Sequence, residues 1–238
     1  MSRRKRKRKG WTACAHCGKP GETFERDHIP PKGLFDNSEN LVVVPWCSVC
    51  YPQAAKDEEY FRAMLLSHHR VGEHPEAKKV MPTFWRSLER PDHKGFVKSI
   101  TNGLKMTDIF TPLGLWAGKV PVYYPNEKRM TRVVQKIVRG LYWHHFGHKP
   151  LPEDWDVWVC WQKNFPEAKQ QSSHANIVAA LQSGPPQILG KGVFRYSYAQ
   201  ASDVPEGTIW LMKFYEAVEF FCTTVMSDQL YTALKASG

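Results

Sequence analysis

The sequence predicts an α+β protein, and three observations support that fold class. Residues 23–29 and 41–44, near the N-terminus, are rich in the residue types that favour β-strands. Residues 127–145 carry apolar side chains at helical spacing. Further strand-type runs follow this helix, over residues 155–161, 193–198 and 209–214. We therefore expect helices and strands to share one chain, in a topology that the pattern does not determine.

Length and composition are those of an ordinary globular protein. The chain has 238 residues, of which 42% are hydrophobic and 24% charged, which is enough to bury a core. No apolar run approaches the roughly 18 residues that a membrane span requires. No apolar segment follows the basic N-terminus as it would in a secretory signal. We expect a cytoplasmic protein with no membrane partner.

Positive charge is concentrated at the N-terminus. The formal net charge is +10, and the consecutive basic residues 3–9 contribute +7 of it, which leaves +3 for the rest of the chain. Such a dense block of like charge predicts a disordered basic tail over residues 1–10. The tail has two interpretations: a tether to the phosphate backbone of a nucleic acid, or a solvated segment that aids solubility.

The remaining chain divides into a compact module, residues 11–70, and a larger mixed α+β region, residues 71–238. In the module, the first strand, residues 23–29, ends where Pro30 and Pro31 interrupt the pattern. Residues 41–44 form the second strand. Residues 54–66 predict a helix with acidic residues near its start. The predicted order is strand, strand, helix.

The helix over residues 127–145 is the clearest element of the larger region. Asn126 precedes it and is a suitable N-cap. Its apolar residues recur at helical spacing and predict a face directed at the core. They are Met130, Val133, Val134, Ile137, Val138, Leu141 and Tyr142. His144, His145 and His148 follow at its end, and we interpret them as structural or surface residues because no carboxylate completes a metal site.

Four of the six cysteines form two close pairs, Cys14 with Cys17 and Cys47 with Cys50. Each C-x2-C pair can direct two sulfurs at one ion, and Gly18 suits the turn that follows the first pair. Four thiolates in this arrangement are typical of a closed, structural zinc site. The alternatives are unrelated core thiols or a redox couple. We expect Zn²⁺ to join the ends of the two predicted strands.

Asp27 and His28 lie at the end of the first predicted strand. Hydrolysis of a phosphodiester bond needs a base that activates water and a positive charge that stabilises the phosphate. A neutral histidine suits the first task, and a carboxylate can hold a cation for the second. An Asp-His dipeptide alone carries little information, so its surroundings decide its interpretation.

Those surroundings resemble the zinc-containing members of the HNH endonuclease family. The segment ERDHIPPKGLF, residues 25–35, is followed by NLVVVP, residues 40–45, then by the second cysteine pair and by AKDEEYFR, residues 55–62. The resemblance covers roughly a fifth of the chain, from Cys14 to Met64. The order of its motifs is specific.

The resemblance implies a ββα-metal finger with a structural zinc. It implies that His28 is the general base and that Asp27 is a ligand of a catalytic Mg²⁺ or Mn²⁺. Asn40 matches the middle letter of HNH, the residue that braces the loop and holds the histidine in place.

One position departs from the pattern, because Tyr51 stands where the family has the third letter, a His or Asn. A neutral phenol is a poor ligand for a hard cation, so Gln53 or Asp57 would have to replace it, or water and phosphate would complete the site, or catalysis would be weakened.

The resulting hypothesis is a metal-dependent endonuclease that cuts nucleic acid, with DNA favoured over RNA by the resemblance. The alternative is an HNH-like zinc module that binds nucleic acid without cutting it, which the departure at Tyr51 favours. A third interpretation gives the main function to residues 71–238. The sequence leaves open whether the chain forms a homodimer.

Overall fold

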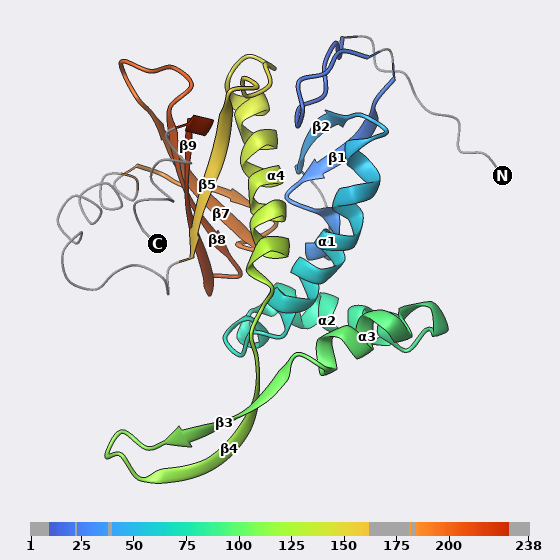
Figure 1. The fold of residues 1–238 in the computed structure, drawn as a ribbon, viewed down its shortest axis with the longest axis vertical. Helices are drawn as coiled ribbons and strands as arrows, with labels where there is room; N and C mark the ends of the chain where they lie inside the picture. The colour runs from blue at the N-terminus through green and yellow to red at the C-terminus, as the bar shows by residue number, and fades with distance from the viewer. Residues whose placement is uncertain (1–9, 22, 38–39, 162–180, 182–183, 229–238) are drawn as a thin grey trace.

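A computed structural model describes residues 10–21, 23–37, 40–161, 181 and 184–228 of the protein. The predicted tail, residues 1–10, lies outside this part except for Gly10. Figure 1 shows α4 in the middle of the molecule, with β1, β2 and α1 on one side of it and a sheet on the other. The mixture of helices and strands confirms the α+β fold class.

The N-terminal elements follow the predicted order of strand, strand, helix. Strand β1 (Glu25–Ile29) pairs antiparallel with β2 (Val42–Trp46), with Asp27 opposite Val44 and His28 opposite Val43. Helix α1 (Cys50–Leu66) follows directly. The expected start of this helix at residue 54 was wrong by one turn. Pro52 lies in the first turn, where a helix tolerates proline because the N–H groups there have no partner within the helix.

Helix α4 (Glu127–His145) has the predicted bounds, and its cap is confirmed. Oδ1 of Asn126 accepts a hydrogen bond of 3.2 Å from the N–H of Arg129, which satisfies one of the unpaired donors at the helix start. The predicted apolar face is buried along its whole length. The helix also buries Gly140, where an added Cβ would lie 2.5 Å from Cγ1 of Ile29. Helix α4 and β1 are therefore packed closely together.

An antiparallel sheet in the order β5-β9-β8-β7-β6 covers the other side of α4. Its strands are β5 (Trp155–Trp161), β6 (Gln187–Leu189), β7 (Phe194–Gln200), β8 (Thr208–Phe214) and β9 (Val218–Met226). Every second residue of β8 is buried, as expected for a sheet with one face on the core. The three strands predicted after α4 are confirmed with small shifts in their bounds, whereas β6 and β9 had not been predicted.

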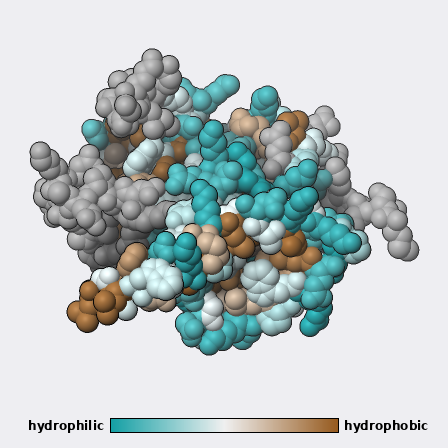
Figure 2. Space-filling view, turned by 60° about the horizontal axis from the view of Figure 1, so that its bottom comes forward, coloured by the Kyte–Doolittle hydropathy of each residue, from teal (hydrophilic) through white to brown (hydrophobic). Residues whose placement is uncertain are grey.

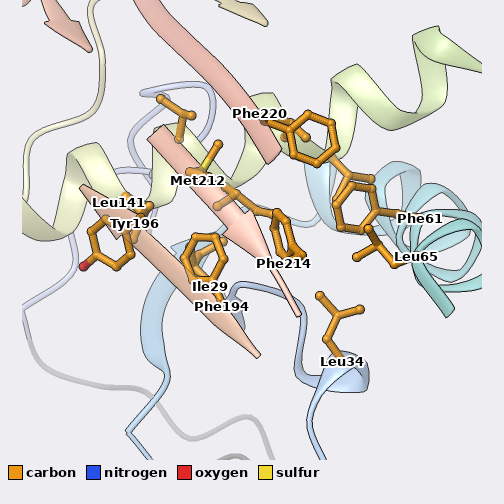
Figure 3. Packing of buried hydrophobic residues seen from close by; sticks show 14 of the residues in the cluster. Ile29, Leu34, Phe61, Leu65, Leu141, Phe194, Tyr196, Met212, Phe214 and Phe220 are labelled. Carbon is orange, nitrogen blue, oxygen red and sulfur yellow. The ribbon is translucent and has the colours of Figure 1, made fainter. Parts of the chain in front are cut away.

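One hydrophobic core joins the sheet to the N-terminal elements. Figure 3 shows Phe194, Phe214 and Phe220 of the sheet beside Phe61 of α1 and Ile29 of β1. The Phe61 and Phe214 rings meet edge to face with centroids 5.3 Å apart. Burying aromatic residues contributes strongly to stability. The packing of the larger region therefore fixes the position of α1 relative to β1.

Between α1 and α4 the chain forms α2 (Pro75–Leu88), α3 (Lys94–Thr101) and a hairpin of β3 (Leu104–Phe110) and β4 (Trp116–Tyr123). The hairpin extends away from the rest of the molecule, and its apolar tip protrudes at the lower left of Figure 2. None of these elements had been predicted. Within the described residues, no helix combines the length and apolar character needed to cross a membrane.

Candidate functional site

The four paired cysteines meet at one point. The sulfurs of Cys14, Cys17, Cys47 and Cys50 all lie within 4.8 Å of one another. Sγ of Cys17 is 3.8 Å from Sγ of Cys47, and the N–H of Cys47 donates to Sγ of Cys14 at 3.4 Å. The cluster could therefore hold a metal ion such as zinc. Of the described residues, this is the one group of three or more ligating side chains with that capacity.

Local backbone structure explains how the cysteines come together. The N–H of Gly18 donates to the carbonyl of Cys14 at 2.9 Å, and Gly18 has a φ of +70°, a conformation that favours glycine. The second pair lies between the end of β2 and the first turn of α1, where the N–H of Tyr51 donates to the carbonyl of Cys47. A hydrogen bond of 2.9 Å from Ala15 to the carbonyl of Pro45 attaches the first turn to β2.

The thiols differ in their environments. Burial raises the pKa of Cys14 and also that of Cys50. At Cys47, burial acts in the same direction but is outweighed by hydrogen bonds from the backbone and side chain of Cys50, so the pKa falls to about 7. A bound cation favours the thiolate form of each ligand. Metal binding at this cluster would therefore release protons from the buried thiols.

Asp27 and His28 point to opposite sides of β1, because successive side chains alternate along a strand. Asp27 is buried, whereas His28 is half-buried and its neighbour Arg26 is exposed. Burial lowers the pKa of His28, and the charge of Asp27 opposes that effect. The imidazole is therefore neutral near pH 7, which is the form that a general base requires.

The Asp27 carboxylate faces Lys136 of α4. Nζ of Lys136 lies 2.5 Å from Oδ2 of Asp27 and also forms an ion pair with Oε1 of Glu58. It sits over the indole ring of Trp46, 4.8 Å from the ring centroid. Only 2% of the Lys136 side chain is exposed. Burial lowers the pKa of Lys136 and raises that of Asp27, while their mutual attraction opposes both changes.

The residues around Asp27 do not fit a catalytic Mg²⁺ or Mn²⁺ in this structure. The carboxylate that would bind the ion already contacts an ammonium group. Tyr51, at the third-letter position, is 41% exposed. Mg²⁺ needs an octahedral shell of oxygen ligands and retains several waters, whereas the ligand position at Oδ2 of Asp27 is already filled by the ammonium of Lys136.

Asp57 and Gln53, the two residues considered as metal ligands in place of Tyr51, do not make the site fit a divalent ion. The Asp57 carboxylate is occupied at both oxygens, with Nε of Arg129 at 2.7 Å and Nε of Arg132 at 2.6 Å. Burial alone would raise the pKa of Asp57, but these two arginines lower it below its ordinary value. The side chain of Gln53 lies outside the described residues.

Asn40 lies two residues before β2, and its backbone is left-handed with a φ of +64°. Its side chain is exposed and lines a pocket of about 300 Å³ together with Asp36, Glu76 and Lys79. Within the described part of the chain, no hydrogen bond joins Asn40 to His28. The bracing role that the resemblance implies for Asn40 therefore stays a prediction.

A second pocket, of about 570 Å³, lies between α1 and α4 beside the cysteine cluster. Basic side chains line it, namely Lys56, Arg129, Arg132 and Lys136, with Asp57 among them. Arg132 is 56% exposed and can reach solvent. A hollow lined mainly by cations beside the cysteine cluster could accept phosphate groups. Sequence reasoning missed the two arginines, although their spacing of three residues places them on one face of a helix.

The histidines at the end of α4 include both expected kinds, because His144 and His148 are exposed at the surface whereas His145 is structural. Nε2 of His145 is 2.9 Å from the hydroxyl of Tyr196, and its ring packs 4.3 Å from that of Tyr198. Burial lowers the pKa of His145 to about 4. These contacts tie the end of α4 to the sheet.

Comparisons with models of known protein families, with curated proteins and with solved structures found no match in any of the three.

Proposed function

We propose that this protein is an HNH-type endonuclease that hydrolyses phosphodiester bonds in nucleic acid. The observation that carries the proposal is the position of His28. This neutral, half-buried histidine lies on a β-hairpin that is followed directly by α1, and a four-cysteine cluster joins the hairpin to that helix. The motifs that resemble the HNH family lie on these same elements.

In this proposal His28 takes a proton from the attacking water. The base must be neutral to do so, and the lowered pKa of His28 favours that state at pH 7. The basic pocket between α1 and α4 lies on the Asp27 side of β1, opposite His28, so Lys56 and Arg132, its most accessible groups, are proposed to contact phosphates away from the bond that is cut. DNA is the expected substrate, and a 3′-hydroxyl and a 5′-phosphate are the expected products, both by resemblance.

The cysteine cluster is proposed to bind one structural Zn²⁺. A closed set of four thiolates leaves no coordination position for water, so this ion would stabilise the finger and take no part in hydrolysis. The ion would hold the turn that carries the first cysteine pair against the end of β2 and the start of α1. The basic residues 3–9, which lie outside the described residues, are proposed to strengthen binding through counterion release.

The catalytic Mg²⁺ or Mn²⁺ implied by the resemblance is not included in the proposed reaction. Asp27 contacts Lys136, and the third-letter position holds Tyr51. The same two facts favour a second candidate function, in which the zinc-stapled module binds nucleic acid without cutting it. Salt-sensitive binding without cleavage would distinguish this second candidate from the first.

One experiment separates the two candidates. Zinc-loaded protein is incubated with supercoiled plasmid and with single-stranded DNA and RNA, with and without added Mg²⁺ or Mn²⁺. His28→Ala is the test variant, and His69→Ala, at an exposed histidine after α1, is the matched control. Cleavage by the parent and the control but not by His28→Ala supports the endonuclease. A gel shift that weakens with salt, without cleavage by any variant, supports the binding protein.

A further inference from the structure

Lys136 is the most deeply buried charged side chain near the candidate site, and its ammonium lies between two carboxylates. Asp27 comes from β1 and Glu58 from α1, so the lysine of α4 links three elements. We propose that Lys136 is a built-in cation that occupies the place of the divalent ion beside Asp27. This inference rests on the proposed relationship to HNH nucleases, because that relationship assigns a cation to Asp27.

The contacts of the ammonium are those of an enclosed cation site. Both carboxylates reach the same nitrogen, and the face of Trp46 closes a third side. The Asp27 side chain is 9% exposed and that of Glu58 23%. Carboxylates and an aromatic face all attract positive charge. These groups together form a site that favours a cation, and the ammonium of Lys136 occupies it.

The backbone of α4 cannot move away easily. Val133, one turn before Lys136, and Ile137, the residue after it, are 2% and 0% exposed. Gly140, one turn further along, lies so close to Ile29 of β1 that it leaves no room for a side chain. Withdrawing the lysine would also leave the buried carboxylate of Asp27 and the half-buried carboxylate of Glu58 without this positive partner, which is unfavourable. The ammonium of Lys136 therefore stays between the two carboxylates and is not readily displaced by a metal ion.

Two consequences follow. First, the parent protein does not bind a divalent or trivalent ion at Asp27. Second, replacing Lys136 with a small neutral residue removes a positive charge at contact distance and leaves room for an ion and its waters, so the two carboxylates become a metal site. Any hydrolysis by the parent then proceeds at the same rate with or without added Mg²⁺, as long as the structural zinc is retained.

Terbium luminescence tests the inference without any need for activity. Tb³⁺ prefers carboxylate oxygens, and indole can sensitise its emission when the two are close, so Trp46 serves as a local antenna. In the zinc-loaded, full-length parent, no part of the Tb³⁺ signal should depend on Asp27. Asp27→Asn should therefore leave the signal of the parent unchanged. Lys136→Ala should gain a signal that depends on Asp27 and should bind Tb³⁺ at this site, which the parent does not. The matched control is Lys128→Ala, an exposed lysine on the same helix, which should behave like the parent.

Two further variants locate the signal. Asp27→Asn combined with Lys136→Ala should abolish the new binding. Trp46→Phe combined with Lys136→Ala should abolish the sensitised emission but keep binding of Mn²⁺, measured from the electron spin resonance of the free ion. These two results together would place the ion beside Asp27 and the indole.

The inference is overturned if the parent binds Mn²⁺ or Tb³⁺ and loses that binding in Asp27→Asn. It is also overturned if folded Lys136→Ala gains no such binding. If Lys136→Ala does not fold, Lys136→Gln is used in its place. The test for ion binding at Asp27 in the parent needs neither variant and can overturn the inference by itself. Mg²⁺-dependent cleavage by the parent that Asp27→Asn abolishes would overturn this inference while supporting the nuclease, so the two proposals fail separately.

Discussion

The ammonium nitrogen of Lys136 lies 2.5 Å from Oδ2 of Asp27. This contact connects the central helix of the larger region to the strand that carries His28. It makes the candidate site a product of both regions, because α4 supplies the positive charge that faces the carboxylate of β1. The state of the site therefore depends on how α4 is packed.

Breaking this pair from one side should be costly. We expect Lys136→Met to lower the free energy of unfolding by about 3–5 kcal/mol, because it leaves the buried Asp27 and the half-buried Glu58 without their cation. Asp27→Asn in the same chain should recover part of that loss, since one of the uncompensated charges is then absent. Urea unfolding of the parent, both single variants and the double variant gives the coupling energy. Strictly additive losses would contradict the ion pair.

The cysteine cluster predicts a metal content of about one zinc per chain. Cys14→Ser should lose the metal and lower the melting temperature, because a ligand with no exposed surface is removed from a closed set of four. Zinc released from denatured protein can be measured with a chromogenic chelator. Cys160→Ser, outside the cluster, is the control and should keep its zinc. Equal zinc in both variants would rule out the site.

The contact between α4 and β1 predicts an effect of adding one methyl group. Gly140→Ala would place a Cβ 2.5 Å from Cγ1 and 2.8 Å from Cδ1 of Ile29. We expect a loss of about 1–3 kcal/mol from overpacking, and partial recovery when Ile29→Val is added. Gly95→Ala in α3, where nothing lies within 4 Å, should instead be neutral or slightly stabilising. The measurement is the urea midpoint of each variant.

His145 predicts a pH dependence of stability. Its pKa is about 4 in the folded protein because of burial, against an ordinary value of 6.5. Between these values the unfolded chain binds more protons, so stability is lost as the pH falls from 6.5 towards 4. His145→Gln should reduce the difference in unfolding free energy between pH 7 and pH 5 by about 1–2 kcal/mol. The same difference in the parent and in His145→Gln would contradict the burial of a neutral His145.

The elements closest to the site could be predicted because local patterns determine them. The apolar spacing and the Asn126 cap gave both bounds of α4, and the cysteine spacing brought four sulfurs together. The start of α1 was placed at residue 54, whereas the helix begins at Cys50 and holds Pro52 in its first turn, a position that accepts proline.

Other features depend on tertiary contacts that no local pattern contains. Helix α2 has Pro82 in its interior, which argues against a helix in the sequence. The β3–β4 hairpin exposes most of its apolar residues, so they give no burial signal. Lys136 interrupts the apolar face of α4, and in the sequence this interruption was the one sign that its side chain is buried. Its partners, Asp27 and Glu58, become evident only once α1, β1 and α4 are packed together.

The most direct test of the account is the rate at which zinc-loaded protein nicks supercoiled plasmid, compared between the parent and His28→Ala at equal zinc content. If His28 activates water, the parent nicks the plasmid and the variant is slower by about 100-fold or more, the usual loss when a general base is removed. Equal rates in the two proteins, or no nicking by the folded parent, would contradict the assignment of His28 as the base.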